Sequence, residues 1–96
     1  MEHNGKPIEV RYQEFPQELR GVVKGLATAK FESKYIILID STQHAQTQRY
    51  TLGHELAHIC LNHFESKKPI ADLEREASER AWEYYRLYSS SIQVNK

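Results

Sequence analysis

The sequence predicts an α+β fold in which a small antiparallel or mixed β-sheet packs beside two helices. Strand-like alternation and β-branched residues are concentrated in the first half of the chain, and apolar residues at helical spacing dominate the second half. A length of 96 residues fits one domain, residues 1–96, and no linker or internal repeat divides it. We therefore expect one sheet and two helices around a single small core.

Three segments of the first half are expected to form strands. Residues 8–12 alternate apolar and polar side chains with a period of two. Residues 20–24 and 26–32 are expected to form one long bent strand or two short ones, because glycines mark bulges or turns there. Residues 35–39 are almost continuously apolar and β-branched, which predicts the central strand, covered on both faces.

Two helices are expected to follow these strands. Potential capping residues at 40–42, and the absence of glycine and proline until Gly53, predict a helix over about residues 43–63. Pro69 suits a first helical turn, and apolar residues spaced by three or four predict a second helix over about residues 69–89. Residues 90–96 are expected to be a frayed tail.

The composition excludes several classes of protein. Thirteen Lys and Arg balance thirteen Asp and Glu, so no net positive charge favours nucleic acid or anionic lipid as a partner. The longest strictly apolar run, residues 36–39, is far shorter than the ~20 residues of a membrane span, and no signal-peptide stretch is present. One cysteine, Cys60, allows no internal disulfide. We expect a cytoplasmic protein without membrane or direct nucleic-acid contacts, whose small core gains stability from a metal ion.

The first predicted helix carries the pattern His-Glu-x-x-His at residues 54–58. Residues four apart project from one face of a helix, so His54 and His58 can bind one Zn²⁺ ion at ~2.0–2.1 Å. Glu55 lies beside the first histidine, where it can take a proton from a water molecule that zinc acidifies. The pattern predicts metal-assisted hydrolysis of an amide. Its plain alternative is a structural α+β domain with two surface histidines and no metal.

A catalytic zinc site needs a third protein ligand. The metzincin class is excluded, because Leu61 and Phe64 stand where that class has glycine and histidine. On a continuing helix, His63 would lie about 180° around the axis from His54, and Cys60 would lie about 160° around it from His58. Neither is therefore expected to share the ion.

The remaining candidates for the third ligand are carboxylates of the second helix: Glu74, Glu76, Glu79 and Glu83. The last two are expected to face solvent, and the first two lie on opposite borders of the apolar stripe. Glu76 is favoured, because Ala77 and Ala81 allow the two helices to approach closely enough for a short carboxylate to reach the ion. The alternative for Glu76 is an ordinary ion pair with Arg80, four residues later.

Two segments resemble the ImmA/IrrE metallopeptidase family. Residues 49–63 read RYTLGHELAHICLNH and residues 74–81 read EREASERA, and the family typically shows R-F-T-L-A-H-E-L-G-H followed by E-A-N-x-F-A. The similarity covers roughly residues 35–85. It implies a gluzincin-like fold, a minimal zincin core, with His54, His58 and Glu76 as metal ligands and Glu55 as general base. It also implies a bacterial or phage regulatory protease, of a family in which several members cleave a helix-turn-helix repressor.

The expected function is therefore a zinc-dependent endopeptidase that cleaves a specific cytoplasmic protein, with a transcriptional repressor as candidate substrate and an activating protein as candidate partner. The alternative is a non-catalytic, metal-stabilised interaction module in a two-protein switch, because so short a chain leaves little surface for a substrate cleft. Arg80 replaces an aromatic residue of the family pattern, so substrate preference is not carried over. The group that stabilises the oxyanion is left open among Tyr50, Tyr84, Tyr85, Tyr88 and Arg80.

Overall fold

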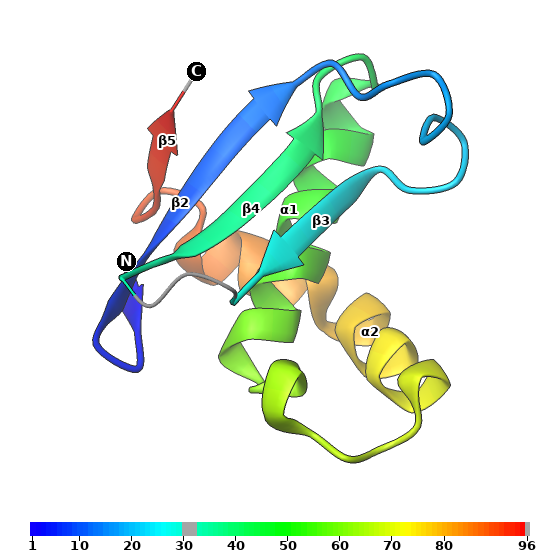
Figure 1. The fold of residues 1–96 in the computed structure, drawn as a ribbon. Coiled ribbons are helices and arrows are strands. Elements are labelled where there is room, and N and C mark those ends of the chain that lie inside the picture. The colour runs from blue at the N-terminus through cyan, green and yellow to red at the C-terminus, as the bar shows by residue number, and fades with distance from the viewer. Residues whose placement is uncertain (30–32, 96) are drawn as a thin grey trace.

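A computed structural model, which describes residues 1–29 and 33–95, shows a mixed β-sheet with α1 against one face and α2 packed on α1 (Figure 1). The predicted α+β class is confirmed. The elements in chain order are β1 (Glu2–His3), β2 (Lys6–Gln13), β3 (Gly25–Thr28), β4 (Tyr35–Asp40), α1 (Ala45–Cys60), a 3₁₀ turn (His63–Glu65), α2 (Ile70–Tyr88) and β5 (Gln93–Asn95).

The sheet is built around β4, as the apolar run at residues 35–39 predicts. β2 pairs with β4 in parallel, with Ile8 opposite Tyr35, and β3 pairs with the other edge of β4 in antiparallel orientation. The strand order β1-β2-β4-β3 leaves β3 at one edge of the sheet. The expected strand at 26–32 ends at Thr28, and residues 30–32 lie outside the described part of the chain.

The C-terminal segment corrects one prediction. Residues 90–96 were expected to fray, but Gln93–Asn95 forms β5 and pairs in parallel with β2, with Val94 opposite Val10. The physical reason is that β1 pairs only with the start of β2. The rest of that edge offers backbone groups to β5, and Ile92, 9% exposed, anchors the segment in the core.

The helix α1 ends at Cys60, earlier than predicted, because Asn62 adopts a left-handed conformation with φ 57°. The Asn62 side-chain oxygen lies 2.8 Å from His3 Nε2 and accepts a hydrogen bond from Asn4 Nδ2 at 3.2 Å. The N-terminal hairpin formed by β1 and β2 therefore stabilises the turn that ends α1. The second helix matches its predicted range within one residue at each end.

The loop before α1 is organised by Asp40, which is fully buried at the end of β4. Its carboxylate accepts hydrogen bonds from the Thr42 N–H and hydroxyl, the Gln43 side chain and the Phe15 N–H. Burial acts to raise the pKa of Asp40, but these hydrogen bonds outweigh it and lower the pKa to about 2. The expected side-chain cap is not formed, since His44 precedes the first helical residue and makes no capping hydrogen bond.

Two glycines bring the elements of the site close together. At Gly53, where α1 crosses α2, an added Cβ would lie 1.9 Å from the backbone oxygen of Ala81. At Gly25, an added Cβ would lie 2.4 Å from Thr51 Cγ2, so β3 also lies directly against α1. The polar face of α1 is therefore bordered by β3 on one side and α2 on the other. Within the described residues, no helix combines the length and apolar character needed to cross a membrane.

Candidate active site

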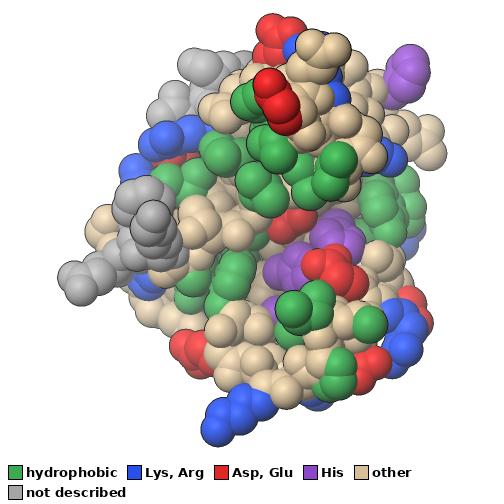
Figure 2. Space-filling model, turned by 45° about the vertical axis from the view of Figure 1, so that its right-hand side comes forward, with side chains coloured by type: hydrophobic (Ala, Val, Ile, Leu, Met, Phe, Trp, Pro, Cys, Tyr) green, Lys and Arg blue, Asp and Glu red, His purple; other side chains and the backbone are tan. Residues whose placement is uncertain are grey.

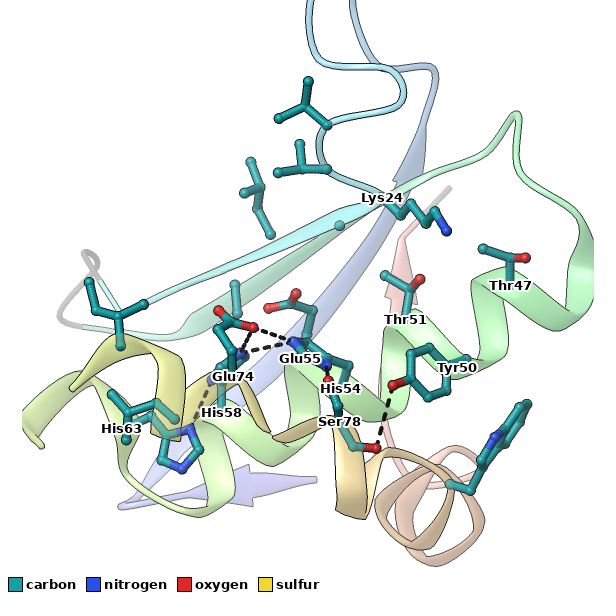
Figure 3. Close-up of a pocket in the computed structure, with 18 of the residues that line it drawn as sticks. Lys24, Thr47, Tyr50, Thr51, His54, Glu55, His58, His63, Glu74 and Ser78 are labelled. Carbon is teal, nitrogen blue, oxygen red and sulfur yellow. Dashed lines mark hydrogen bonds and ion pairs between the residues drawn. The ribbon is translucent and has the colours of Figure 1, made fainter. Parts of the chain in front are cut away.

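Three side chains from the two helices converge at one point. His54 and His58 project from the same face of α1, and their Nε2 atoms lie 3.1 Å apart. Glu74 reaches them from α2, with its Oε2 atom 2.8 Å from His54 Nε2 and 3.3 Å from His58 Nε2 (Figure 3). These two nitrogens and one oxygen form the group in the described chain that is able to hold a metal ion.

The three ligand atoms lie at or slightly below the separations that one zinc ion would need. Ligand atoms at ~2.0–2.1 Å from such an ion are separated by about 3.3 Å, and the three observed separations are 2.8, 3.1 and 3.3 Å. Two imidazoles and one carboxylate leave a fourth position for water or substrate.

The two ligand types are also in the protonation states that metal binding needs. Burial is the largest influence on His58 and lowers its pKa. Burial acts to raise the pKa of Glu74, but the hydrogen bonds with His54 and His58 lower it overall. A neutral imidazole and an ionised carboxylate are therefore favoured at this site.

Glu55 lies in the cleft beside this cluster. It is 8% exposed, and Figure 3 shows its carboxylate directed into the space in front of the histidines. Burial, together with the nearby Glu74 carboxylate, raises the pKa of Glu55 to about 7. A carboxylate with this pKa can both accept and release a proton near neutral pH.

The cluster opens into a cleft of about 690 Å³ between β3 and α2. Figure 2 shows apolar side chains on both sides of the histidines and the neighbouring carboxylates. The exposed apolar residues that line it are Val22, Leu26, Phe64, Ile70 and Trp82. The cleft therefore combines apolar walls with a polar, metal-binding floor.

A comparison with protein-family models matches residues 5–85 to the IrrE N-terminal-like domain, a peptidase family. The chain belongs to the ImmA/IrrE family of metallopeptidases. No curated protein and no solved structure matches the chain. Membership in this family supports a protease that uses a metal ion, and the cluster of His54, His58 and Glu74 is the candidate place for that ion.

In this ImmA/IrrE chain, Glu76 is not beside the two histidines, although the sequence favours it as the third ligand. Its Oε1 atom lies 2.8 Å from His63 Nε2, and its Oε2 atom lies 3.5 Å from Lys68 Nζ. Glu74 and Glu76 leave α2 on opposite borders of its buried stripe, and the border of Glu74 is the one that faces His54. The alternative pairing of Glu76 with Arg80 is not formed either, since Arg80 binds Glu83.

The position of His63 differs from the one that a continuous helix predicts. The count of about 100° per residue assumes a continuous helix through residue 63, but Asn62 reverses the chain direction after Cys60. As a result His63 folds back under α1, and its Nδ1 atom lies 2.8 Å from His58 Nδ1. The second nitrogen of His54 has a partner too, Ser78 Oγ at 3.3 Å. Sequence reasoning missed both contacts, although Ser78 is four residues after Glu74 and so lies on the same face of α2.

Of the five residues considered for oxyanion stabilisation, Tyr50 lines this cleft. Its hydroxyl donates a hydrogen bond to the Ser78 backbone oxygen at 3.4 Å. Tyr84 is buried in the core, and Arg80 lies over its ring while pairing with Glu83. Tyr85 and Tyr88 pack against the core, so Tyr50 is the group of the five nearest to the chemistry.

Proposed function

We propose that the chain is a zinc-dependent endopeptidase in which His54, His58 and Glu74 hold the metal and Glu55 is the general base. The observation that carries the proposal is the convergence of three ligand atoms, two imidazole nitrogens and one carboxylate oxygen, close enough to share one ion. The buried Glu55 beside this position supplies the proton acceptor that hydrolysis needs. Membership in a peptidase family supports the same activity.

The residues of the chain divide the work of peptide hydrolysis between them. His54, His58 and Glu74 would hold a zinc ion, which would polarise the scissile carbonyl and lower the pKa of water. The water oxygen bonds to the carbonyl carbon of the peptide while Glu55 accepts a proton from this water. Glu55 then gives this proton to the amine nitrogen as the C–N bond breaks, and its pKa of about 7 suits both steps. Tyr50, in the wall of the cleft, is the proposed partner of the developing oxyanion.

The cleft fits an extended segment of a protein chain. β3 is the edge strand of the sheet, and Gly25, Leu26 and Ala27 line the cleft. An extended peptide can add to such an edge through backbone hydrogen bonds, and the exposed apolar residues on both walls favour apolar side chains in it. We propose a specific cytoplasmic protein as substrate, with a bacterial or phage helix-turn-helix repressor as the candidate. The balanced charge of the chain favours contact with the repressor itself rather than with DNA.

Glu55→Gln tests the catalytic role. The variant should bind zinc as the wild type does, because Glu55 is not one of the proposed ligands, while cleavage of a co-produced repressor should fall by about 10²–10⁴-fold. Glu79→Gln is the matched control, because Glu79 is an exposed carboxylate on α2. Equal cleavage by the wild type and by Glu55→Gln would remove the catalytic assignment.

The interaction-module alternative makes a different prediction for the same experiment. It expects metal-dependent binding of a partner protein, no cleavage by the wild type, and no effect of Glu55→Gln. Its original basis was that a short chain leaves little surface for a cleft, and the cleft of about 690 Å³ weakens that basis. The peptidase proposal includes an activating partner protein. Adding the proteins encoded by neighbouring genes to the cleavage assay tests for such a partner.

A further inference from the structure

A line of side chains leads from the proposed metal site through His63, which also lines the cleft, to α2. It starts at His58, whose Nδ1 atom lies 2.8 Å from His63 Nδ1. It continues from His63 Nε2 to Glu76 Oε1, also at 2.8 Å. The second oxygen of Glu76 lies 3.5 Å from Lys68 Nζ. Both ring nitrogens of His63 are therefore engaged, one by His58 and one by a carboxylate.

Metal binding by His58 fixes the direction of each hydrogen bond in this line. His58 presents Nε2 to the ligand cluster, and a metal ligand needs a lone pair on that atom. The ring proton of His58 is then on Nδ1, which donates to His63 Nδ1. The proton of His63 is consequently on Nε2, which donates to Glu76. One arrangement of protons satisfies both hydrogen bonds at once.

The surroundings keep this arrangement in place. The His63 side chain is 5% exposed, so its nitrogens cannot readily exchange these partners for water. The left-handed residue Asn62 aims His63 back toward α1, and the N-terminal hairpin holds Asn62. Lys68 lies 3.5 Å from the second oxygen of Glu76, so the outer end of the line is an ion pair.

We propose that His63 and Glu76 are positioning residues that orient the His58 ring and increase its basicity toward the metal. The inference rests on His58 as a ligand in the proposed function. A histidine ligand whose second nitrogen donates to an acceptor binds metal more tightly, and a carboxylate at the end of the line stabilises the positive charge that binding induces. The ring of His54 is oriented by a weaker contact, because its second nitrogen lies 3.3 Å from the neutral Ser78 hydroxyl.

The test measures the Zn²⁺ dissociation constant by competition with a chromophoric chelator, together with the visible spectrum of the Co²⁺-loaded protein. His63→Leu removes the acceptor for His58 and should weaken Zn²⁺ binding by about 10–100-fold. His63→Asn keeps an acceptor, because the Asn Oδ1 atom can occupy the place of Nδ1, so its loss should be smaller. Glu76→Gln removes the charge and should also lose affinity, while Glu79→Gln, an exposed control on the same helix, should bind as the wild type does.

The Co²⁺ spectrum separates positioning from ligation. His63→Asn and Glu76→Gln should keep the band positions of the wild type, because the ligand atoms are unchanged. Wild-type Zn²⁺ affinity in both variants would overturn the proposal, and so would a shifted spectrum in Glu76→Gln, which would make Glu76 a direct ligand. If His63→Leu does not fold, the Zn²⁺ affinities and Co²⁺ spectra of His63→Asn and Glu76→Gln still test the proposal.

Glu74→Gln tests the ligand set separately. Unchanged Zn²⁺ affinity in this variant would overturn the assignment of Glu74 in the proposed function. It would leave the roles of His63 and Glu76 standing, since these depend on His58 alone. Loss of Zn²⁺ binding in Glu74→Gln, with graded losses in the His63 variants, is the result expected from both proposals.

Discussion

Gly53→Ala is a sharp test of the helix crossing, because two effects on stability predict opposite signs. In an ordinary helix interior this change stabilises by about 1 kcal/mol through helix propensity. In this chain the new Cβ would lie 1.9 Å from the Ala81 backbone oxygen and 3.1 Å from Tyr85 Cβ. A carbon–oxygen contact needs about 3.3 Å, so α2 would have to move by about 1.4 Å.

The obstacle at Gly53 is backbone, so no change of rotamer relieves it. Overpacking costs about 1–3 kcal/mol, and a backbone contact should place the cost near 3 kcal/mol. After the gain in helix propensity, we expect Gly53→Ala to lower the free energy of unfolding by about 2 kcal/mol. Adding Ala81→Gly should not restore stability, because the contact is with the oxygen and not with the Ala81 side chain.

Urea unfolding of the metal-free protein, followed by circular dichroism, measures this effect. Arg49→Ala compared with Arg49→Gly, at an exposed position of the same helix, reports the change in propensity from glycine to alanine without the crossing. Gly53→Ala should also weaken zinc binding, because a displaced α2 carries Glu74 away from the histidines. A Gly53→Ala protein that is as stable as the wild type, or more stable, would refute the close crossing.

Two further predictions concern the core and the loop before α1. Leu56→Ala, at a fully buried position, should lower the free energy of unfolding by about 2–5 kcal/mol, and a loss below 1 kcal/mol in urea unfolding would contradict its place in the core. Asp40→Asn should destabilise at neutral pH, because the ionised carboxylate accepts four hydrogen bonds. Since folding lowers the pKa of Asp40 from 3.8 to about 2, its contribution is fully present above pH 3.8 and is lost as the pH falls toward 2. The urea midpoints of wild type and Asp40→Asn should therefore converge over that range, and a constant difference would argue against the Asp40 network.

Sequence reasoning succeeded where one strong periodic signal decided the outcome. The run at residues 35–39 gave the central strand β4, and spacings of three and four gave α2 with its buried stripe. The same periodicity placed His54 and His58 together on the polar face of α1. These features depend on neighbours within one element, which the local sequence specifies.

Sequence reasoning was limited where the outcome depends on how two elements meet. Glu74 and Glu76 lie on opposite borders of one stripe, about 160° apart around the axis of α2, so the side of the stripe on which His54 lies decides which of them reaches it. The position of His63 depends on the left-handed conformation of Asn62, which tertiary contacts with His3 and Asn4 support. The strand β5 depends on an edge of β2 that only the assembled sheet offers. None of these is a property of a single segment.

The close contact between α1 and α2 has a consequence for the order of folding. The proposed metal ligands are close in the sequence: Glu74 lies 20 positions after His54 and 16 positions after His58. The sheet, by contrast, must bring Val10 against Val94 near the other end of the chain. Because the entropy lost on closing a loop grows with its length and local contacts form faster, the helical hairpin is the part of the chain that can assemble first. The metal site would then be a folding nucleus, and refolding would be faster with zinc present than after chelation.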